Sequence, residues 1–436
     1  MNFLVPVMMW GWIPVTIILF RKFAPQKAIL ISVIGGILFL PATAFDIPVI
    51  LYNKETAIAI SLLWGIIFSY KKSVPSFSTK PFNIPIILWC IMSPFLSILT
   101  NGLGLYNAVA AVIESSLAYG VFYVIGRIYF SDKDALRLLT TGIIVGGLIY
   151  VPLALFEVRM SPQLSNIFYG FFPHSFAQHF RYDGYRPIVF MQHGLMVAMW
   201  MSVTFTVSLW LYGTREVVTL KKIPMSVVII FLLITTVLCK SANGWIYSMS
   251  GVFAYYYYKK TKSTLIFKLL VLAIPVYLIL RVSGILPINA IIDFSASIFD
   301  AERVDSLAVR LFQEDVFSQK ALENPLFGWG WMGRAWPRNM ATGEDVVQMI
   351  DSLYLIAFSN YGLFGLFSLY AVLLLGPWKV MKSRTESIDA IVLGVILIFF
   401  TIDTLINGMV NSVFILTAGA LSGYSDKLKL GGHTVT

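Results

Sequence analysis

Long apolar stretches alternate with short polar segments over most of the chain. A helix needs roughly 17–25 apolar residues to cross the hydrocarbon core of a bilayer. Thirteen stretches meet or approach this length, and they lie near residues 3–20, 28–43, 56–70, 83–99, 105–126, 138–156, 187–212, 224–239, 243–258, 264–282, 352–375, 388–407 and 410–424. The pattern predicts an all-α bundle of about 12–13 transmembrane helices that forms one membrane domain over residues 1–436.

Composition supports the same class. The chain is 58% hydrophobic and only 12% charged, with a mean hydropathy of +0.79. A soluble protein could not bury so much apolar surface. Cys90 and Cys239 lie in apolar stretches and are expected to be small buried hydrophobes rather than a disulfide or a metal pair. The four histidines show no ligand spacing, so no metal site is predicted.

The positive charge predicts how the chain is oriented. Of the 32 basic residues, 21 lie in alternate short loops or at adjoining span ends, where they are expected to be cytoplasmic. The amino terminus and the two longest loops then lie outside, and the carboxyl terminus inside. A nucleic-acid-binding protein would gather its charge on one soluble face, so no nucleic-acid partner is expected. The first apolar stretch lacks a basic start and a small-residue cleavage site, so we expect it to be retained.

The two longest loops hold most of the candidate chemistry. Residues 157–186 are rich in Phe and Tyr, and part of this loop is expected to lie flat at the membrane interface. In residues 283–351, Val304, Leu307, Leu311 and Phe312 recur at helical spacing and predict an amphipathic helix that ends before Pro325. The decamer "NPLFGWGWMG" follows, with glycines that permit close backbone approach.

Two carboxylates fall within apolar stretches. Glu114 and Asp403 would cost several kcal/mol to bury unless they are paired or protonated. Neighbouring hydroxyls, Ser115 and Ser116 beside Glu114 and Thr401 and Thr404 beside Asp403, are expected to satisfy them as structural groups. The alternative is that they are coupling groups of a transporter. A transporter predicts two related halves with broken helices, and no such symmetry is found.

Four motifs occur in a characteristic order. "RPIVFMQHGLMVAMW" covers residues 186–200, "CKSANGW" 239–245, "RLFQEDVFSQKALENPLFGWGWMG" 310–333 and "DSLYLIAFSNYGLFGL" 351–366. Together they resemble the O-antigen ligase/polymerase superfamily of bacterial surface-polysaccharide assembly, over less than half of the chain. Three positions depart from the family pattern: Gly194 stands where Pro is usual, Asn243 alters a Ser-Arg-Gly turn, and Asp351 stands where the ligases have His.

The resemblance implies transfer of a glycan from a polyprenyl-pyrophosphate donor to an acceptor hydroxyl, by a metal-independent, GT-C-like membrane glycosyltransferase without a cofactor. Cations must then neutralise the pyrophosphate leaving group. Arg186 and Arg310 match the motif positions, and Arg303 and Arg334 are further outer-face cations. Their alternative role is contact with solvent or lipid headgroups.

The attacking hydroxyl needs a base or an orienting group. Asp351 matches the family's His position, and its alternative role is to cap the helix that follows. His193 is a second candidate base, with orientation of the site or a buried polar contact as its alternatives. Trp329 and Trp331 offer flat faces that either stack on sugars or anchor the turn at the interface.

The expected function is a polymerase that joins lipid-linked oligosaccharide repeats, for O-antigen or exopolysaccharide synthesis. One alternative is the ligase that moves glycan onto lipid A-core, and another is a polysaccharide or lipid transporter. The expected partners are the polyprenyl-pyrophosphate-linked oligosaccharide, the bilayer and a chain-length regulator protein. The expected location is the bacterial inner membrane, with the active face in the periplasm.

Overall fold

The structure is a computed structural model that describes residues 1–68, 84–181, 183–298, 301–338, 350–383 and 385–431. It is 75% helical with almost no sheet. Within the described residues, six helices are long and apolar enough to cross a membrane by length and composition. The chain is an all-α polytopic membrane protein, as the hydropathy pattern predicts.

Each of the thirteen predicted apolar stretches contains helix in the described part of the chain. Several are shorter than 18 residues, and two are divided by a π-helical turn. The helices of the bundle are α1 (Leu4–Lys22), α2 (Pro25–Phe39), α3 (Lys54–Phe68), α4 (Ile84–Ile87) with α5 (Ser93–Thr100), α6 (Leu105–Ser115) with α7 (Val121–Tyr129), α8 (Lys133–Met160), α10 (Gly194–Gly213), α11 (Met225–Leu238), α12 (Ala242–Thr261), α13 (Leu265–Val282), α16 (Leu353–Lys382), α17 (Ile388–Asp403) and α18 (Ser412–Gly431).

Three further helices lie in the two long loops: α9 (Leu164–Tyr169), α14 (Ile288–Ala296) and α15 (Ala301–Leu322). The amphipathic helix predicted ahead of Pro325 is therefore present as α15. Two small hairpins, β1 (Ala44–Ile47) with β2 (Ile50–Asn53) and β3 (Thr219–Leu220) with β4 (Ile223–Pro224), were not expected from the hydropathy pattern.

The apolar stretch near 187–212 is not helical over its whole length, because α10 begins at Gly194. The preceding backbone is held by the buried carboxylate of Glu157, which accepts from the N–H groups of Ile188 at 2.8 Å and Val189 at 2.7 Å. A carboxylate that captures these donors removes them from any helical ladder.

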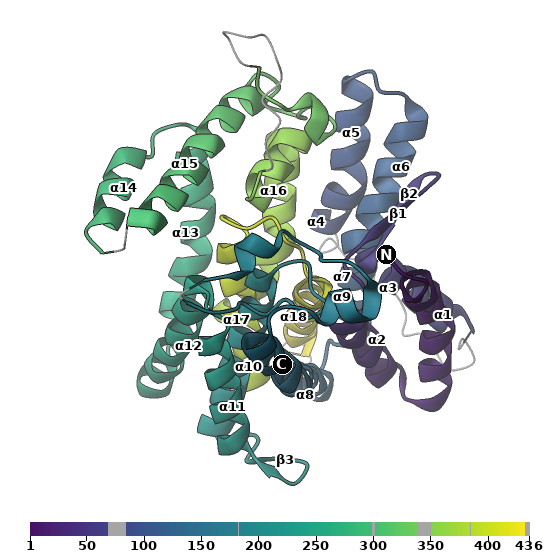
Figure 1. Cartoon of the computed structure of the whole chain (residues 1–436), viewed down its shortest axis with the longest axis vertical. Helices are drawn as coiled ribbons and strands as arrows, with labels where there is room; N and C mark the ends of the chain where they lie inside the picture. The colour runs from purple at the N-terminus through teal and green to yellow at the C-terminus, as the bar shows by residue number, and fades with distance from the viewer. Residues whose placement is uncertain (69–83, 182, 299–300, 339–349, 384, 432–436) are drawn as a thin grey trace.

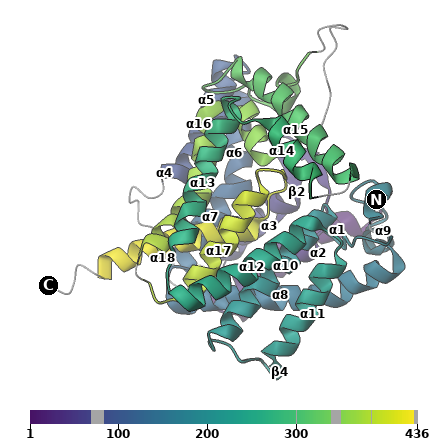
Figure 2. The same cartoon turned by 90° about the vertical axis from the view of Figure 1, so that its left-hand side faces the viewer.

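The described parts of the two long loops lie at one end of the bundle, which we call the loop face (the described residues of 161–193 and 283–352). Figure 2 shows α9, α14, α15 and the amino terminus toward this end, and the carboxyl terminus and β4 away from it. Contacts agree: Asn2 N–H donates to Tyr169 O at 3.0 Å, and Lys54 Nζ donates to Phe190 O at 2.7 Å. The amino terminus and the first long loop are therefore at the same end.

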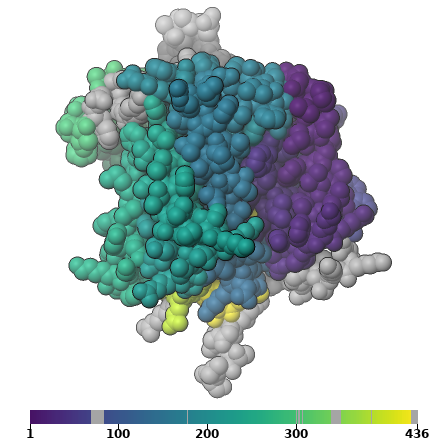
Figure 3. Space-filling view, turned by 60° about the horizontal axis from the view of Figure 1, so that its bottom comes forward, coloured from purple at the N-terminus to yellow at the C-terminus, as the bar shows by residue number. Residues whose placement is uncertain are grey.

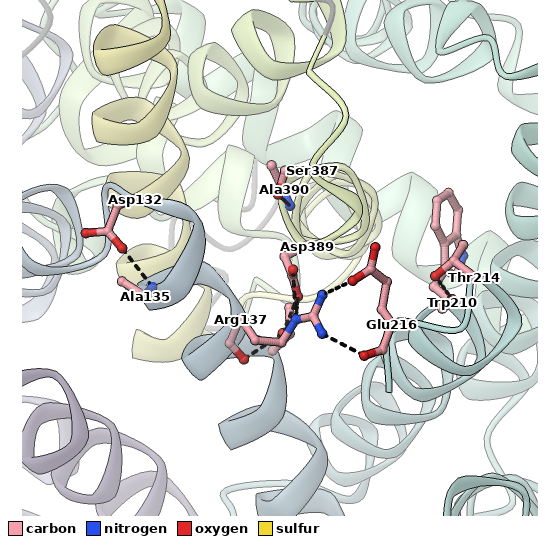
Figure 4. Close-up of polar contacts among 10 residues, drawn as sticks. Asp132, Ala135, Arg137, Trp210, Thr214, Glu216, Ser387, Asp389 and Ala390 are labelled. Carbon is pink, nitrogen blue, oxygen red and sulfur yellow. Dashed lines mark hydrogen bonds and ion pairs between the residues drawn. The ribbon is translucent and has the colours of Figure 1, made fainter. Parts of the chain in front are cut away.

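The opposite end holds Arg137, one of the basic residues that the sequence assigns to one side of the membrane. Arg137, near the start of α8, places its Nε 2.9 Å from Asp389 at the start of α17. Its Nη2 lies 2.5 Å from Glu216, which follows α10 (Figure 4). Asp132 caps α8 by accepting from the Ala135 N–H at 2.9 Å. This cluster ties three helices together at the end away from the long loops.

The core forms by close packing between helices. Gly419 of α18 and Gly126 of α7 leave no room for a side chain: a Cβ on Gly419 would lie 1.9 Å from Tyr123 O. Small residues at such contacts let membrane helices approach closely. Figure 3 shows the N-terminal helices and the middle of the chain as adjacent blocks on the surface.

Cys90 and Cys239 are both buried and free, as predicted.

Candidate active site

The candidate site begins with an ion pair at the loop face. Arg310 on α15 places its Nε 3.3 Å from Oδ2 of Asp351, which lies just before α16. Both side chains remain partly accessible, at 35% and 53% exposed. The two residues that the sequence proposed for leaving-group binding and for base chemistry therefore meet. In Figure 1, α15 lies beside the start of α16 at the upper end of the molecule.

The capping alternative for Asp351 was wrong. The N-cap position of α16 is Ser352, and no side chain caps this helix. The neighbour of the Asp351 carboxylate is the guanidinium of Arg310. An aspartate that does not serve the helix end and stays half exposed beside a cation is available for another role.

A small pocket lies at this ion pair. It is lined by Arg310, Gln313, Glu314, Phe317, Ile350, Asp351 and Leu355. Its volume of about 10 Å³ is room for roughly one water molecule. Because both charged side chains are partly exposed, a larger ligand would reach them from the surface of the loop face rather than through this pocket.

The decamer explains why α15 and α16 meet. Pro325 O accepts from the Leu363 N–H at 2.7 Å, and the Trp329 and Gly330 N–H groups donate to Ser359 O and Asn360 O, each at 2.9 Å. These bonds run through a break in α16 at Gly362, whose φ is +65°. A Cβ on Gly362 would lie 2.4 Å from the Leu326 backbone. The decamer thus fastens the end of α15 to α16, as its glycines predicted.

A buried network of ion pairs and hydrogen bonds holds α15 against α13 and α16. Arg281, at the end of α13, is 1% exposed, and its Nε lies 3.3 Å from Glu314 Oε2. Tyr354 OH donates to the same oxygen at 2.9 Å. Burial raises the pKa of Glu314, and the Tyr354 hydrogen bond and the Arg281 charge act against that rise. Glu314 lies one helical turn after Arg310, so this network sets the orientation of the Arg310 face.

The first long loop supplies the second predicted arginine. Arg186 donates through Nη2 to Lys240 O at 3.1 Å, and its backbone N–H donates to His179 O at 2.7 Å. Its Nε is buried without a hydrogen-bond partner among the described residues. Burial, followed by the nearby charges of Arg181 and Arg310, lowers the pKa of Arg186 to about 10. An unpaired N–H on a partly buried guanidinium favours an anionic ligand.

His193 lies beside Arg186 and caps α10. Its Nδ1 accepts from the Leu195 N–H at 3.0 Å. Burial and the neighbouring charges of His174 and Arg186 lower the pKa of His193 to about 3, so the ring is neutral at physiological pH. With Nδ1 accepting, the proton resides on Nε2, which is then a donor rather than a base. The geometry favours the orienting role over the base role for His193.

Three of the four histidines are adjacent, although the sequence showed no ligand spacing. The ring centroids of His174 and His193 are 4.7 Å apart, and those of His179 and His193 are 6.2 Å apart. Within the residues that the structure describes, no group of three His, Cys, Asp or Glu side chains is placed to hold a metal ion. The backbone carbonyl of His179 joins this cluster to Arg186 by accepting from the Arg186 N–H.

The two arginines and His193 belong to one electrostatic neighbourhood. The charge of Arg310 acts on Arg186 and on His193, although α15 and the first loop are more than a hundred residues apart in sequence. The loop face therefore brings together cations from both long loops, with Asp351 at one side.

The expectation for Asp403 was wrong in its partners. Its Oδ1 accepts from Asn407 at 2.8 Å, from Tyr247 OH at 3.1 Å and from Asn243 at 3.4 Å. The hydroxyls of Thr401 and Thr404 donate instead to backbone carbonyls of α17. Because a helical Thr reaches its own i−4 or i−3 carbonyl, neighbouring hydroxyls are poor partners for a helix carboxylate. Glu114 is exposed on α6.

The other predicted site residues make contacts elsewhere or lie outside the described residues. Arg334 donates to Asn101 O at 3.3 Å. The indole N–H of Trp329 donates to Lys320 O at 2.9 Å, and Lys320 Nζ lies 4.2 Å above its ring. Trp331 is 52% exposed. The side chain of Arg303 lies outside the described residues.

Sequence reasoning missed two groups that shape the site. Arg281 was not singled out. A basic residue at the end of an apolar run, together with the acidic pair at 314–315, could have suggested an ion pair. Lys240 stands inside the quoted "CKSANGW" motif, and its carbonyl holds Arg186. Every residue has a backbone carbonyl, so the identity of residue 240 does not predict this contact.

The comparison with known families matches the same region. The family model described as O-antigen ligase matches residues 226–370. This range contains the Lys240 turn, α15, the decamer and Asp351. No curated protein and no solved structure matches the chain. The matched region, which holds three of the four motifs, supports a relationship of this part of the chain to the O-antigen ligase/polymerase superfamily.

Proposed function

We propose that the protein is a membrane glycosyltransferase that polymerises lipid-linked oligosaccharide repeats. The observation that carries the proposal is the meeting of Arg310 with Asp351 at 3.3 Å, in the electrostatic neighbourhood of Arg186. The family match supports polysaccharide assembly in general. The donor would be a polyprenyl-pyrophosphate-linked glycan, and the acceptor another lipid-linked repeat.

The cations would act on the leaving group. As the bond between the anomeric carbon and the pyrophosphate oxygen breaks, that oxygen takes the electron pair and gains negative charge. Arg310 and the guanidinium of Arg186, whose Nε has no hydrogen-bond partner among the described residues, would neutralise that charge. Stabilisation by donors already in position is commonly the largest single contribution of an enzyme to its rate.

Asp351 would act on the acceptor. Pyrophosphate oxygens compete with Asp351 for Arg310, so donor binding separates the ion pair and frees the carboxylate. Asp351 then takes the proton of the acceptor hydroxyl as its oxygen bonds to the anomeric carbon. The partial exposure of both side chains supports this order, because an anionic donor can reach Arg310 at the loop face.

A ligase is the second candidate, and the description of the matched family favours it. The same cations and carboxylate would serve transfer onto lipid A-core, since only the acceptor changes. The departure at Asp351, where the ligases have His, favours the polymerase. One argument for the transporter alternative was that Asp403 could be a coupling group. That argument is weaker, because three side chains already hydrogen-bond Asp403 within the bundle.

The charge distribution supports a location. We place the loop face in the periplasm and the protein in the bacterial inner membrane, since 21 of the 32 basic residues belong to the segments that the sequence assigns to the other side. A chain-length regulator protein is the natural partner of a polymerase at that face.

Deletion of the gene separates the candidates. A polymerase mutant accumulates a single repeat on the carrier lipid, whereas a ligase mutant accumulates long polymer on the carrier. Purified protein should convert isolated lipid-linked repeats into longer chains and release polyprenyl pyrophosphate. Unchanged lipid-linked glycans in the deletion strain would refute both enzymatic roles.

A further inference from the structure

A second hollow lies on the far side of α15 from the ion pair. It is formed by the end of α13, by α14 and by α15, and its volume is about 510 Å³. This falls within the roughly 300–1,000 Å³ typical of small-ligand sites. We call it the α13–α15 hollow. Its lining includes Ser283, Asn289, Phe312, Asp315, Ser318 and Gln319.

The two sides of α15 are different in chemistry. Arg310, Glu314 and Phe317 form one stripe of the helix, and Phe312, Asp315 and Gln319 form the opposite one. A helix with its side chains is about 10–12 Å across. A ligand in the hollow is therefore separated from Arg310 by the width of the helix, which is more than one sugar ring.

The hollow has no net charge to offer a phosphate. Arg281 and Asp315 are the charged residues among its lining, and they form an ion pair with each other. Arg281 is also held by Glu314. The amides of Asn289 and Gln319 donate and accept hydrogen bonds, as do hydroxyls. These groups suit a ligand that is rich in hydroxyls and uncharged.

Two side chains lack the partners that their position calls for. Ser318 is 5% exposed, and its hydroxyl is buried without a hydrogen-bond partner among the described residues, although it lines the hollow. Phe312 lies in the same lining and is 52% exposed. A buried hydroxyl without a partner costs free energy, and an exposed aromatic face is favourable only against a ligand or lipid.

We propose that the α13–α15 hollow binds an uncharged sugar residue of the glycan, at least one ring away from the reacting bond. Phe312 stacks on the ring, and Ser318, Asn289 and Gln319 hydrogen-bond its hydroxyls. The proposal rests on the proposed glycan transfer and adds a subsite to it. The hollow would hold part of the glycan while its reducing end reaches Arg310 and Asp351.

The test measures binding apart from transfer. The probe is the repeat-unit oligosaccharide, released from its carrier lipid by mild acid, and the protein is the full chain in nanodiscs. Phe312→Ala and Gln319→Ala should each weaken binding by about tenfold. Both side chains are exposed, so folding should be unaffected, and thermal unfolding checks this. Val316→Ala is the matched control, because Val316 is 45% exposed on α15 and lies outside the hollow.

The outcomes are separable from the proposed function. If wild-type protein transfers glycan but both variants bind the oligosaccharide as tightly as wild type, the hollow is not a sugar site. If wild type fails to transfer but the variants lose binding, the subsite stands and the reaction assignment fails. Loss of a co-purified phospholipid from Phe312→Ala in native mass spectrometry, with sugar binding unchanged, would assign the hollow to lipid and overturn the proposal.

Discussion

The guanidinium of Arg310 lies 3.3 Å from the carboxylate of Asp351, across the seam between α15 and α16. The pair is partly exposed, so its own contribution to stability is small, about 0–1 kcal/mol. We expect the pair to matter for function rather than for stability, because each partner becomes available when the other is displaced. In the proposed reaction, an anionic donor would take Arg310, and the freed carboxylate would face the acceptor. The pair would then couple donor binding to activation of the acceptor.

The first prediction concerns Asp351. Asp351→Asn should fold normally and lose roughly 10²–10⁴ in transfer rate, because the amide cannot take a proton. Capping cannot explain such a loss, since the N-cap position belongs to Ser352. The measurement is transfer by purified protein under single-turnover conditions. The charge-swapped double variant Arg310→Asp/Asp351→Arg is the control: recovered activity would mean that the pair is only structural.

The second prediction concerns the arginines. Arg310→Ala and Arg186→Ala should each abolish transfer while expression persists, for a loss of about 2–4 kcal/mol in transition-state stabilisation. Lysine should restore activity only in part, because it lacks the planar fork. Initial rates at saturating donor distinguish this from weakened binding. Near-full activity of Arg310→Ala would move the leaving-group role to Arg334 or Arg303.

The third prediction tests the break in α16. Gly362→Ala should destabilise the protein by about 1–3 kcal/mol, because its φ is +65° and the new Cβ would meet the Leu326 backbone at 2.4 Å. Transfer should fall with it, since α15 loses its anchor. Gly11→Ala is the matched control, with nothing within 4 Å of its Cβ position. Equal melting temperatures for the two variants would contradict the role given to the decamer.

The fourth prediction concerns His193 and pH. Asn is also a good N-cap, so His193→Asn should keep the fold and much of the activity. Burial, as the largest cause, lowers the pKa of His193 to about 3 and that of His179 to about 4. The unfolded chain protonates both near pH 6.5, so it binds more protons between about pH 6.5 and 4. Stability should therefore fall as the pH drops through this window.

The same variant provides the check. His193→Asn removes one of the two groups, so its melting temperature should depend less on pH between 6.5 and 4 than that of wild type. Thermal unfolding in detergent at several pH values measures this. A variant that folds but loses transfer by 10²-fold or more would restore His193 as the base.

The fifth prediction concerns orientation. Single cysteines at Asn289, in α14, and at Lys222, in the β3–β4 turn, should react with a membrane-impermeant reagent from opposite sides of the inner membrane. Asn289 should label in intact cells with a permeabilised outer membrane, and Lys222 only after the inner membrane is opened. Labelling of both from the same side would refute the assignment of the loop face to the periplasm.

Sequence alone determined the class of the fold and much of its layout. Each apolar stretch contains helix because a chain in lipid must satisfy its backbone hydrogen bonds internally. The alternation of basic loops predicted which ends lie together, and the contacts of Asn2 with Tyr169 agree. The helix α15 and the close backbone approach at the decamer also followed from local pattern, because helical periodicity and glycine are local properties.

Tertiary structure decided which polar groups meet. Asp351 could cap a helix or face a cation, and only the docking of α15 on α16 placed Arg310 beside it. Asp403 found Asn407, Tyr247 and Asn243 rather than its neighbouring hydroxyls, since those partners come from another helix and a loop. Glu157 accepts hydrogen bonds from backbone N–H groups about thirty residues away, so α10 begins after them. Such contacts depend on distances between segments far apart in the chain, and residue type does not encode those distances.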